Sequence, residues 1–166
     1  MSEPTTNLLV AMAEECAQFR IVGPATFVQA PAFRSAAEAL RGRGHRRFVV
    51  DLSACLTMDS TFIGVLAGLA RKLRALGGTV ELVNAGERIQ LQIGNLGILP
   101  FFEWPRRKTA GVADFQAVPA GPTGKTALTE VALSAHQDLM AANPDNVARF
   151  KDVAEFLAQE LKAGGS

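Results

Sequence analysis

A short polar segment, Asp59-Ser60-Thr61, stands directly before apolar residues that step by four, three, four and three positions over residues 62–76. This spacing predicts a helix over residues 60–76 with a hydroxyl at its start. A hydroxyl at that place caps free backbone N–H groups, and a phosphate joined to it meets the positive end of the helix dipole. Phosphorylation adds about 1.5 to 2 negative charges, and Asp59 alongside would strengthen the repulsion of a partner. Ser60 is therefore the first candidate for modification and Thr61 the second.

The chain has two histidines and two cysteines that could take part in catalysis or metal binding. His45 lies in a basic loop and His136 near the C-terminus, and neither is predicted to lie beside Ser60 or Cys55. A nucleophile needs such a base, so we expect both histidines to be solvated surface residues and predict no catalytic residue. Cys16 and Cys55 lack the spacing of a zinc site or a disulfide framework. We therefore expect no metal, no cofactor and a reducing cytoplasm.

A second candidate for ligand binding is Gly124-Lys125-Thr126, which precedes a predicted helix and resembles part of a phosphate-binding loop. The full motif has another glycine five residues before Gly124, whereas this chain has Pro119 there. Proline donates no amide hydrogen bond and does not adopt a positive φ. A flexible linker is the favoured interpretation, and a nucleotide-binding protein that uses Lys125 stays open as an alternative.

The composition limits the classes of protein to which this chain can belong. The 166 residues carry a formal net charge of +1, and 48% of them are apolar. These values predict one packed domain with an extension. A charge so close to zero provides no global field that attracts nucleic acid, so no nucleic-acid partner is predicted. The apolar runs are shorter than the about 18 residues that a membrane span needs, so we expect a soluble cytoplasmic protein.

Strand-like and helix-like segments alternate along the first two thirds of the chain. Apolar runs rich in β-branched and aromatic residues predict strands at residues 8–13, 18–22, 46–52 and 79–83. Apolar residues at helical spacing predict helices at about residues 31–41, 60–76 and 86–95. This alternation predicts an α/β fold with a mixed, mostly parallel sheet flanked by helices.

The sequence divides into a domain over residues 1–108, a linker over 109–125 and a C-terminal helical hairpin over 126–166. The linker has no period, and Asn143-Pro144 separates the two helices of the hairpin. Each helix has only a narrow apolar stripe, so we expect the hairpin to pack on its own domain or on a second copy in a homodimer.

Charge predicts where the hairpin docks on its own domain. Residues 129–162 carry six acidic and three basic side chains, whereas residues 34–47 carry five arginines and one glutamate. Docking near the basic Arg41–Arg47 loop is therefore the predicted intramolecular arrangement.

The strand, turn and helix around Ser60 carry a specific family pattern. The pattern consists of Asp51-Leu52-Ser53, Met58-Asp59-Ser60-Thr61, Gly64 and the break at Gly77-Gly78. At these residues the sequence closely resembles the STAS family, the domain shared by sulfate transporters and bacterial anti-sigma factor antagonists. The resemblance covers roughly residues 8–105 and leaves the C-terminal hairpin as an additional extension. Phe62 stands where many members have glycine, and Pro24-Ala25-Thr26 replaces the more usual acidic turn.

The resemblance implies a non-enzymatic, partner-switching module of bacterial transcription regulation and signal transduction. It implies that a serine kinase of the anti-sigma factor type phosphorylates Ser60 and that a PPM-type phosphatase removes the phosphate. It also implies partner contacts at Asp59, Ser60, Thr61, Phe62 and Gly64, with Phe62 at the exposed start of the helix. A subunit that is never phosphorylated, such as the STAS component of a lipid-transport ATPase complex, stays open as an alternative.

Overall fold

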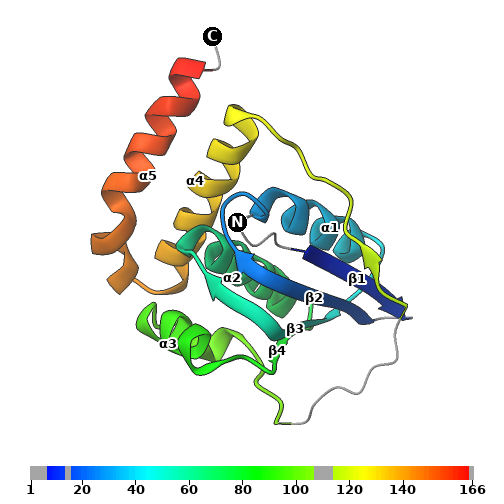
Figure 1. Ribbon diagram of the computed structural model, residues 1–166. Helices are drawn as coiled ribbons and strands as arrows, with labels where there is room; N and C mark the ends of the chain where they lie inside the picture. The colour runs from blue at the N-terminus through cyan, green and yellow to red at the C-terminus, as the bar shows by residue number, and fades with distance from the viewer. Residues whose placement is uncertain (1–6, 14–15, 107–113, 165–166) are drawn as a thin grey trace, which may run out of the picture.

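The computed structural model describes residues 7–13, 16–106 and 114–164 (Figure 1). Its centre is a five-stranded sheet with the strand order β4-β3-β2-β1-β5. The strands are β1 (Asn7–Ala13), β2 (Cys16–Ala25), β3 (Arg47–Met58), β4 (Thr79–Val83) and β5 (Gln116–Ala117). β3 runs parallel to β2 and β4, whereas β1 runs antiparallel to β2 and β5. The predicted α/β fold with a mixed sheet is confirmed, and its described strand pairs are parallel and antiparallel in equal number.

Two helices cover one face of the sheet, α1 (Ala30–Gly42) and α2 (Ser60–Ala75) (Figure 1). β2 shows why, because its residues alternate between fully buried and half-exposed along its whole length. Phe19 on the buried face lies 4.8 Å from the ring of Phe33 in α1, and Phe33 lies 5.1 Å from the ring of Phe62 in α2. Each buried phenylalanine contributes about 1.5 to 3 kcal/mol to folding. This aromatic cluster fixes α1 and α2 against the sheet.

The two central strands are longer than the sequence predicts. β2 continues through Gly23, which has a φ of 94°, and Pro24, and β3 continues through the segment that we expected to form a polar turn. The strands stay paired as far as Ala25 and Met58, with irregular register between Arg20 and Ala25. The extended pairing delivers the polar segment at Asp59 directly to the end of a rigid strand.

The edges of the sheet and the remaining helices complete the domain. α3 (Glu87–Asn95) confirms the helix expected at 86–95, and it is followed by the short 3-10 helix η1 (Leu99–Phe101). Beyond η1, the backbone of Glu103 pairs with the outer edge of β4 through hydrogen bonds with Val80 and Leu82. On the other edge β5 pairs with Leu9 and Val10 of β1.

The C-terminal hairpin consists of α4 (Lys125–Ala142) and α5 (Asp145–Gly164), as expected. The side chain of Asn143 accepts a hydrogen bond of 2.9 Å from the backbone N–H of Asp145. α4 packs along α2, and α5 packs on α4 (Figure 1). The prediction that the hairpin docks near the Arg41–Arg47 loop is wrong. α4 packs instead against the small residues Gly64 and Gly68 of α2, which let the two helices approach closely.

The division into a domain over 1–108, a linker over 109–125 and a hairpin over 126–166 stays a prediction. Its residues 1–6, 14–15, 107–113 and 165–166 lie outside the described residues. Within the predicted linker, β5 adds a strand that the sequence pattern did not indicate.

Candidate functional site

Asp59 fixes the turn between β3 and α2 through both of its carboxylate oxygens. One oxygen accepts a 2.8 Å hydrogen bond from the backbone N–H of Phe62, which makes Asp59 the N-cap of α2. The other accepts a 2.7 Å hydrogen bond from the backbone N–H of Phe27 in the loop between β2 and α1. The expectation that Ser60 caps the helix is wrong, because Ser60 is already the first helical residue. Its hydroxyl is therefore available to another partner.

That partner is His136 of α4. Ser60 Oγ lies 3.0 Å from His136 Nε2, and His136 Nδ1 lies 2.6 Å from the carbonyl oxygen of Ala132. A carbonyl oxygen only accepts hydrogen bonds, so Nδ1 carries a proton. In the tautomer with its single proton on Nδ1, Nε2 accepts a hydrogen bond and the Ser60 hydroxyl donates it. The sequence pattern does not predict this contact, because it is the docking of α4 on α2 that brings the two side chains together.

The prediction that His136 is a solvated surface residue is also wrong. Its residue exposure is only 6%, and its ring lies 5.0 Å from the ring of Phe150 in α5. A hydroxyl beside an oriented imidazole is the geometry of an activated nucleophile. Neither Ser60 nor His136 lines the pocket between α1, α2 and α4, the pocket at the β4 edge, the pocket between the start of α4 and the end of α5, or the pocket between α1 and residues 118–123. None of these four pockets therefore offers a substrate access to this pair.

Three of the five residues predicted to contact a partner, Thr61, Phe62 and Gly64, are buried. Asp59 and Ser60 are half-buried, but Thr61 is 6% exposed and Phe62 is fully buried. The expectation that Phe62 lies at the exposed start of the helix is wrong, because its side chain points into the core beside Phe33. The residues of this set that reach the surface are Asp59 and Ser60.

Gly64 lies under α4. A Cβ atom on Gly64 would lie 2.7 Å from the carbonyl carbon and 2.8 Å from the Cβ of Ala135. One turn further along α2, a Cβ on Gly68 would lie 3.0 Å from the Cγ of Asp138. Sequence reasoning missed this contact, although the four-residue spacing of Gly64 and Gly68 on one helix face is a signal for close helix packing.

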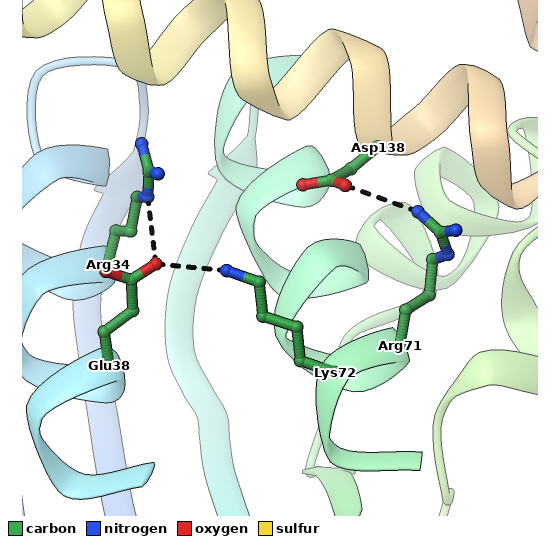
Figure 2. A network of polar contacts seen from close by, with 5 residues as sticks. All are labelled: Arg34, Glu38, Arg71, Lys72 and Asp138. Carbon is green, nitrogen blue, oxygen red and sulfur yellow. Dashed lines mark hydrogen bonds and ion pairs between the residues drawn. The ribbon is translucent and has the colours of Figure 1, made fainter. Parts of the chain in front are cut away.

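Charged side chains connect α1, α2 and α4 beyond these glycines (Figure 2). Asp138 of α4 lies 3.3 Å from Arg71 of α2, while Glu38 of α1 lies 3.3 Å from Arg34 and 3.2 Å from Lys72. Burial raises the pKa of Asp138, and the neighbouring cations only partly oppose this effect. Burial would also raise the pKa of Glu38, but its hydrogen bonds and charge interactions with Lys72 and Arg34 lower it below the usual value. Partly exposed pairs of this kind contribute about 0 to 1 kcal/mol each. The pair between Arg71 and Asp138 therefore orients α4 more than it holds it.

The junction of the hairpin is attached to the end of α3. Asn143 Nδ2 donates to the carbonyl oxygen of Gly97 at 3.2 Å. Asn146, which is 1% exposed, donates from Nδ2 to the carbonyl oxygens of Leu96 and Leu139, both at 2.9 Å. These bonds satisfy buried carbonyl groups and add a second point of attachment to the one at Ser60.

The glycine-lysine segment ahead of α4 has a different setting. The side chain of Lys125 is 85% exposed and lies 3.4 Å from a carboxylate oxygen of Glu160. A carboxylate at this place repels a phosphate, so the geometry gives the nucleotide-binding alternative no support. Among the described residues there is also no group of three or more His, Cys, Asp or Glu side chains that could hold a metal ion. None of the described helices is both long enough and apolar enough to cross a membrane.

The comparisons with known proteins agree with this fold. The family model of the STAS domain matches residues 7–112, so the chain belongs to the STAS domain family. Among solved structures, an anti-sigma factor antagonist from Mycobacterium paratuberculosis is 25% identical with a TM-score of 0.56, over 64% of this chain and 92% of that chain. No protein of curated function matches the chain. The resemblance inferred from the strand, turn and helix is confirmed.

Two states of a second antagonist share the fold. The anti-sigma factor antagonist SpoIIAA in its unphosphorylated form is 19% identical with a TM-score of 0.51, over 63% of this chain and 90% of that chain. The Bacillus cell fate determinant SpoIIAA in its phosphorylated form is 19% identical with a TM-score of 0.52, over 60% and 92%. The STAS match ends at residue 112, so α4 and α5 lie beyond it.

Proposed function

We propose that this chain is a bacterial anti-sigma factor antagonist whose binding to a serine kinase is switched by phosphorylation of Ser60. The observation that carries the proposal is the position of Ser60. It is the first residue of α2, it follows an N-cap that fixes the turn, and it stands at the end of a central strand. The family membership and the 25% identical antagonist of known structure support the same class of function. The protein acts by binding in the cytoplasm, as a regulator and not as an enzyme.

The chemistry at Ser60 is a reversible phosphoryl transfer. The kinase moves the γ-phosphoryl group of ATP to Ser60 Oγ, the hydroxyl proton leaves to a base, and ADP is released. A PPM-type phosphatase uses water to restore the hydroxyl and to release inorganic phosphate. The free N–H groups at the start of α2 tolerate the phosphate, while Asp59 adds to the negative charge that a partner meets.

An apolar rim beside this site supports a protein partner. Phe27 is 50% exposed and Val28 is 58% exposed, and the backbone of Phe27 is bonded to Asp59. Leu56, near the end of β3, is 59% exposed. Exposed apolar residues around a polar centre are typical of protein-binding surfaces. In this proposal the unphosphorylated form binds the kinase here and frees the kinase's other partner.

The test uses the purified full chain, ATP and a lysate of the native host as the source of kinase. Mass spectrometry is expected to find phosphate on Ser60 and none on the Ser60→Ala variant. Calorimetry with the kinase recovered from that lysate is expected to give weaker binding for Ser60→Asp than for Ser60→Ala. Phosphate confined to other residues would contradict the proposal.

One observation favours a second candidate, a STAS subunit of a transport complex that is never phosphorylated. The Ser60 hydroxyl is occupied by His136 and lies against α4. A permanent contact of this kind would keep a kinase away. Equal binding of the alanine and aspartate variants, together with no phosphate on Ser60, would favour this candidate.

A further inference from the structure

We propose that the α4–α5 hairpin is a displaceable cover over Ser60, so that hairpin docking and Ser60 phosphorylation exclude one another. The inference rests on the proposed function, because it names the regulation of the same serine. It concerns the part of the chain that lies beyond the STAS match.

A phosphate on Ser60 conflicts with the hydrogen bond that the docked hairpin makes to this residue. In the docked form the Ser60 hydroxyl donates a hydrogen bond to His136 Nε2, 3.0 Å away. The oxygens of a serine phosphate are mostly unprotonated at neutral pH, because its second pKa is about 6, so two acceptors would face each other. A proton on Nε2 would restore a donor, but the charged ring and the phosphate would then both be desolvated under α4, where His136 is 6% exposed.

The imidazole has little room to move aside while α4 stays in place. Its Nδ1 is held by the carbonyl oxygen of Ala132, and its other side packs against the ring of Phe150. One residue earlier in α4, Ala135 is 1% exposed and presses on Gly64. A phosphate on Ser60 therefore acts on the helix as a whole and not on one side chain.

The segment that joins the hairpin to the sheet permits this movement. Its residues Pro122, Thr123 and Gly124 are exposed, and none of these three takes part in a strand or helix. On the outer side of α5, Val147, Val153 and Phe156 are 42 to 59% exposed. The hairpin thus contacts the domain through α4 and through Asn143 and Asn146 between the two helices, while these apolar residues of α5 face solvent.

Hairpin docking and Ser60 phosphorylation are linked equilibria, so each changes the other. If the kinase reaches Ser60 only in the undocked form, the rate of phosphorylation falls by the fraction of time that the hairpin is docked. Phosphorylation must shift the same equilibrium toward the undocked form, because coupling between two sites is reciprocal. The hairpin thereby sets how readily Ser60 responds to its kinase.

The first experiment needs no kinase. Phosphoserine is placed at position 60 of the full chain during synthesis, and hydrogen exchange is followed by mass spectrometry. Amides of residues 125–142 are expected to exchange at least tenfold faster than in the unmodified chain, while β3 and β4 keep their protection. Phosphoserine at the exposed Ser53 is the matched control and is expected to leave α4 protected. Unchanged or stronger protection of α4 in the protein modified at Ser60 would overturn the inference.

The second experiment opens the hairpin without changing Ser60. Ala135→Leu adds bulk where α4 meets Gly64, and Ala141→Leu makes the same change at an exposed position of the same helix. With host lysate and ATP, Ser60 is expected to be phosphorylated at least tenfold faster in Ala135→Leu than in Ala141→Leu. Equal rates would overturn the inference.

The two experiments separate the inference from the proposed function. If no variant is phosphorylated by the lysate, the proposed function is contradicted, and hydrogen exchange alone decides whether a phosphate displaces the hairpin. If phosphoserine at position 60 also removes the protection of the sheet, the phosphorylation rates of the two leucine variants decide.

Discussion

Gly64 of α2 lies so close to Ala135 of α4 that no side chain fits between the two helices. A Cβ on Gly64 would lie 2.7 Å from the Ala135 carbonyl carbon, which is backbone and does not move aside alone. This close contact explains why the acidic hairpin docks along α2 and not near the basic residues around Arg41.

The first prediction concerns this contact. Gly64→Ala is expected to lower the free energy of unfolding by about 1 to 3 kcal/mol through overpacking, although alanine alone favours a helix by about 1 kcal/mol. Gly42, in the last turn of α1, has no atom within 4 Å of an added Cβ, so Gly42→Ala is the matched control and should not destabilise. Urea denaturation measures both. A Gly64→Ala variant as stable as the control would show that α4 does not need the close approach.

The second prediction concerns the bond between Ser60 and His136. His136→Ala removes the acceptor of the Ser60 hydroxyl and the ring that packs on Phe150, so we expect a loss of about 1 to 3 kcal/mol. Hydrogen exchange should localise the loss to α4 and α5. His45→Ala, outside this interface, is the control. Uniformly faster exchange across the sheet would contradict a local role for His136.

The third prediction concerns pH. Burial raises the pKa of Asp138, so the folded state holds the proton more tightly than the unfolded chain does. The contribution of Asp138 to the free energy of unfolding is therefore fully present below its ordinary pKa of 3.8. It falls as the pH rises through the higher pKa that Asp138 has in the folded state. The stability of Asp138→Asn relative to the unchanged protein should increase over that range. Denaturation at several pH values tests this, with the exposed Asp152→Asn as control. A stability difference that does not change with pH would contradict the prediction.

The fourth prediction concerns the two thiols. Burial raises the pKa of Cys55 to about 11 and also raises that of Cys16. The thiolate is the reactive form, so both cysteines should react with iodoacetamide at pH 8 more slowly in the folded protein than in urea. Equal rates in the two conditions would show that the thiols are not protected by the fold.

The sequence predicts the elements better than their contacts. The helix at α2 follows from the spacing of its apolar residues, and the polar segment before it marks the site at Ser60. The docking of α4 escaped prediction because it depends on Gly64 and on backbone shape. The charges of the Arg41–Arg47 loop give only a weak attraction, because Arg43 and Arg47 are exposed to solvent. Phe62 was expected at the surface because it stands near a helix start, but its direction is set by Phe33 of another helix.

The two borders of the sheet bear on the solubility of the protein. An unpaired outer strand offers a row of free N–H and C=O groups to which another chain can add. Here the backbone of Glu103 occupies part of the open side of β4, and β5 occupies part of the open side of β1. Among the described residues, only short stretches of β4 and β1 are left unpaired on these sides, which limits growth into fibrils by strand addition.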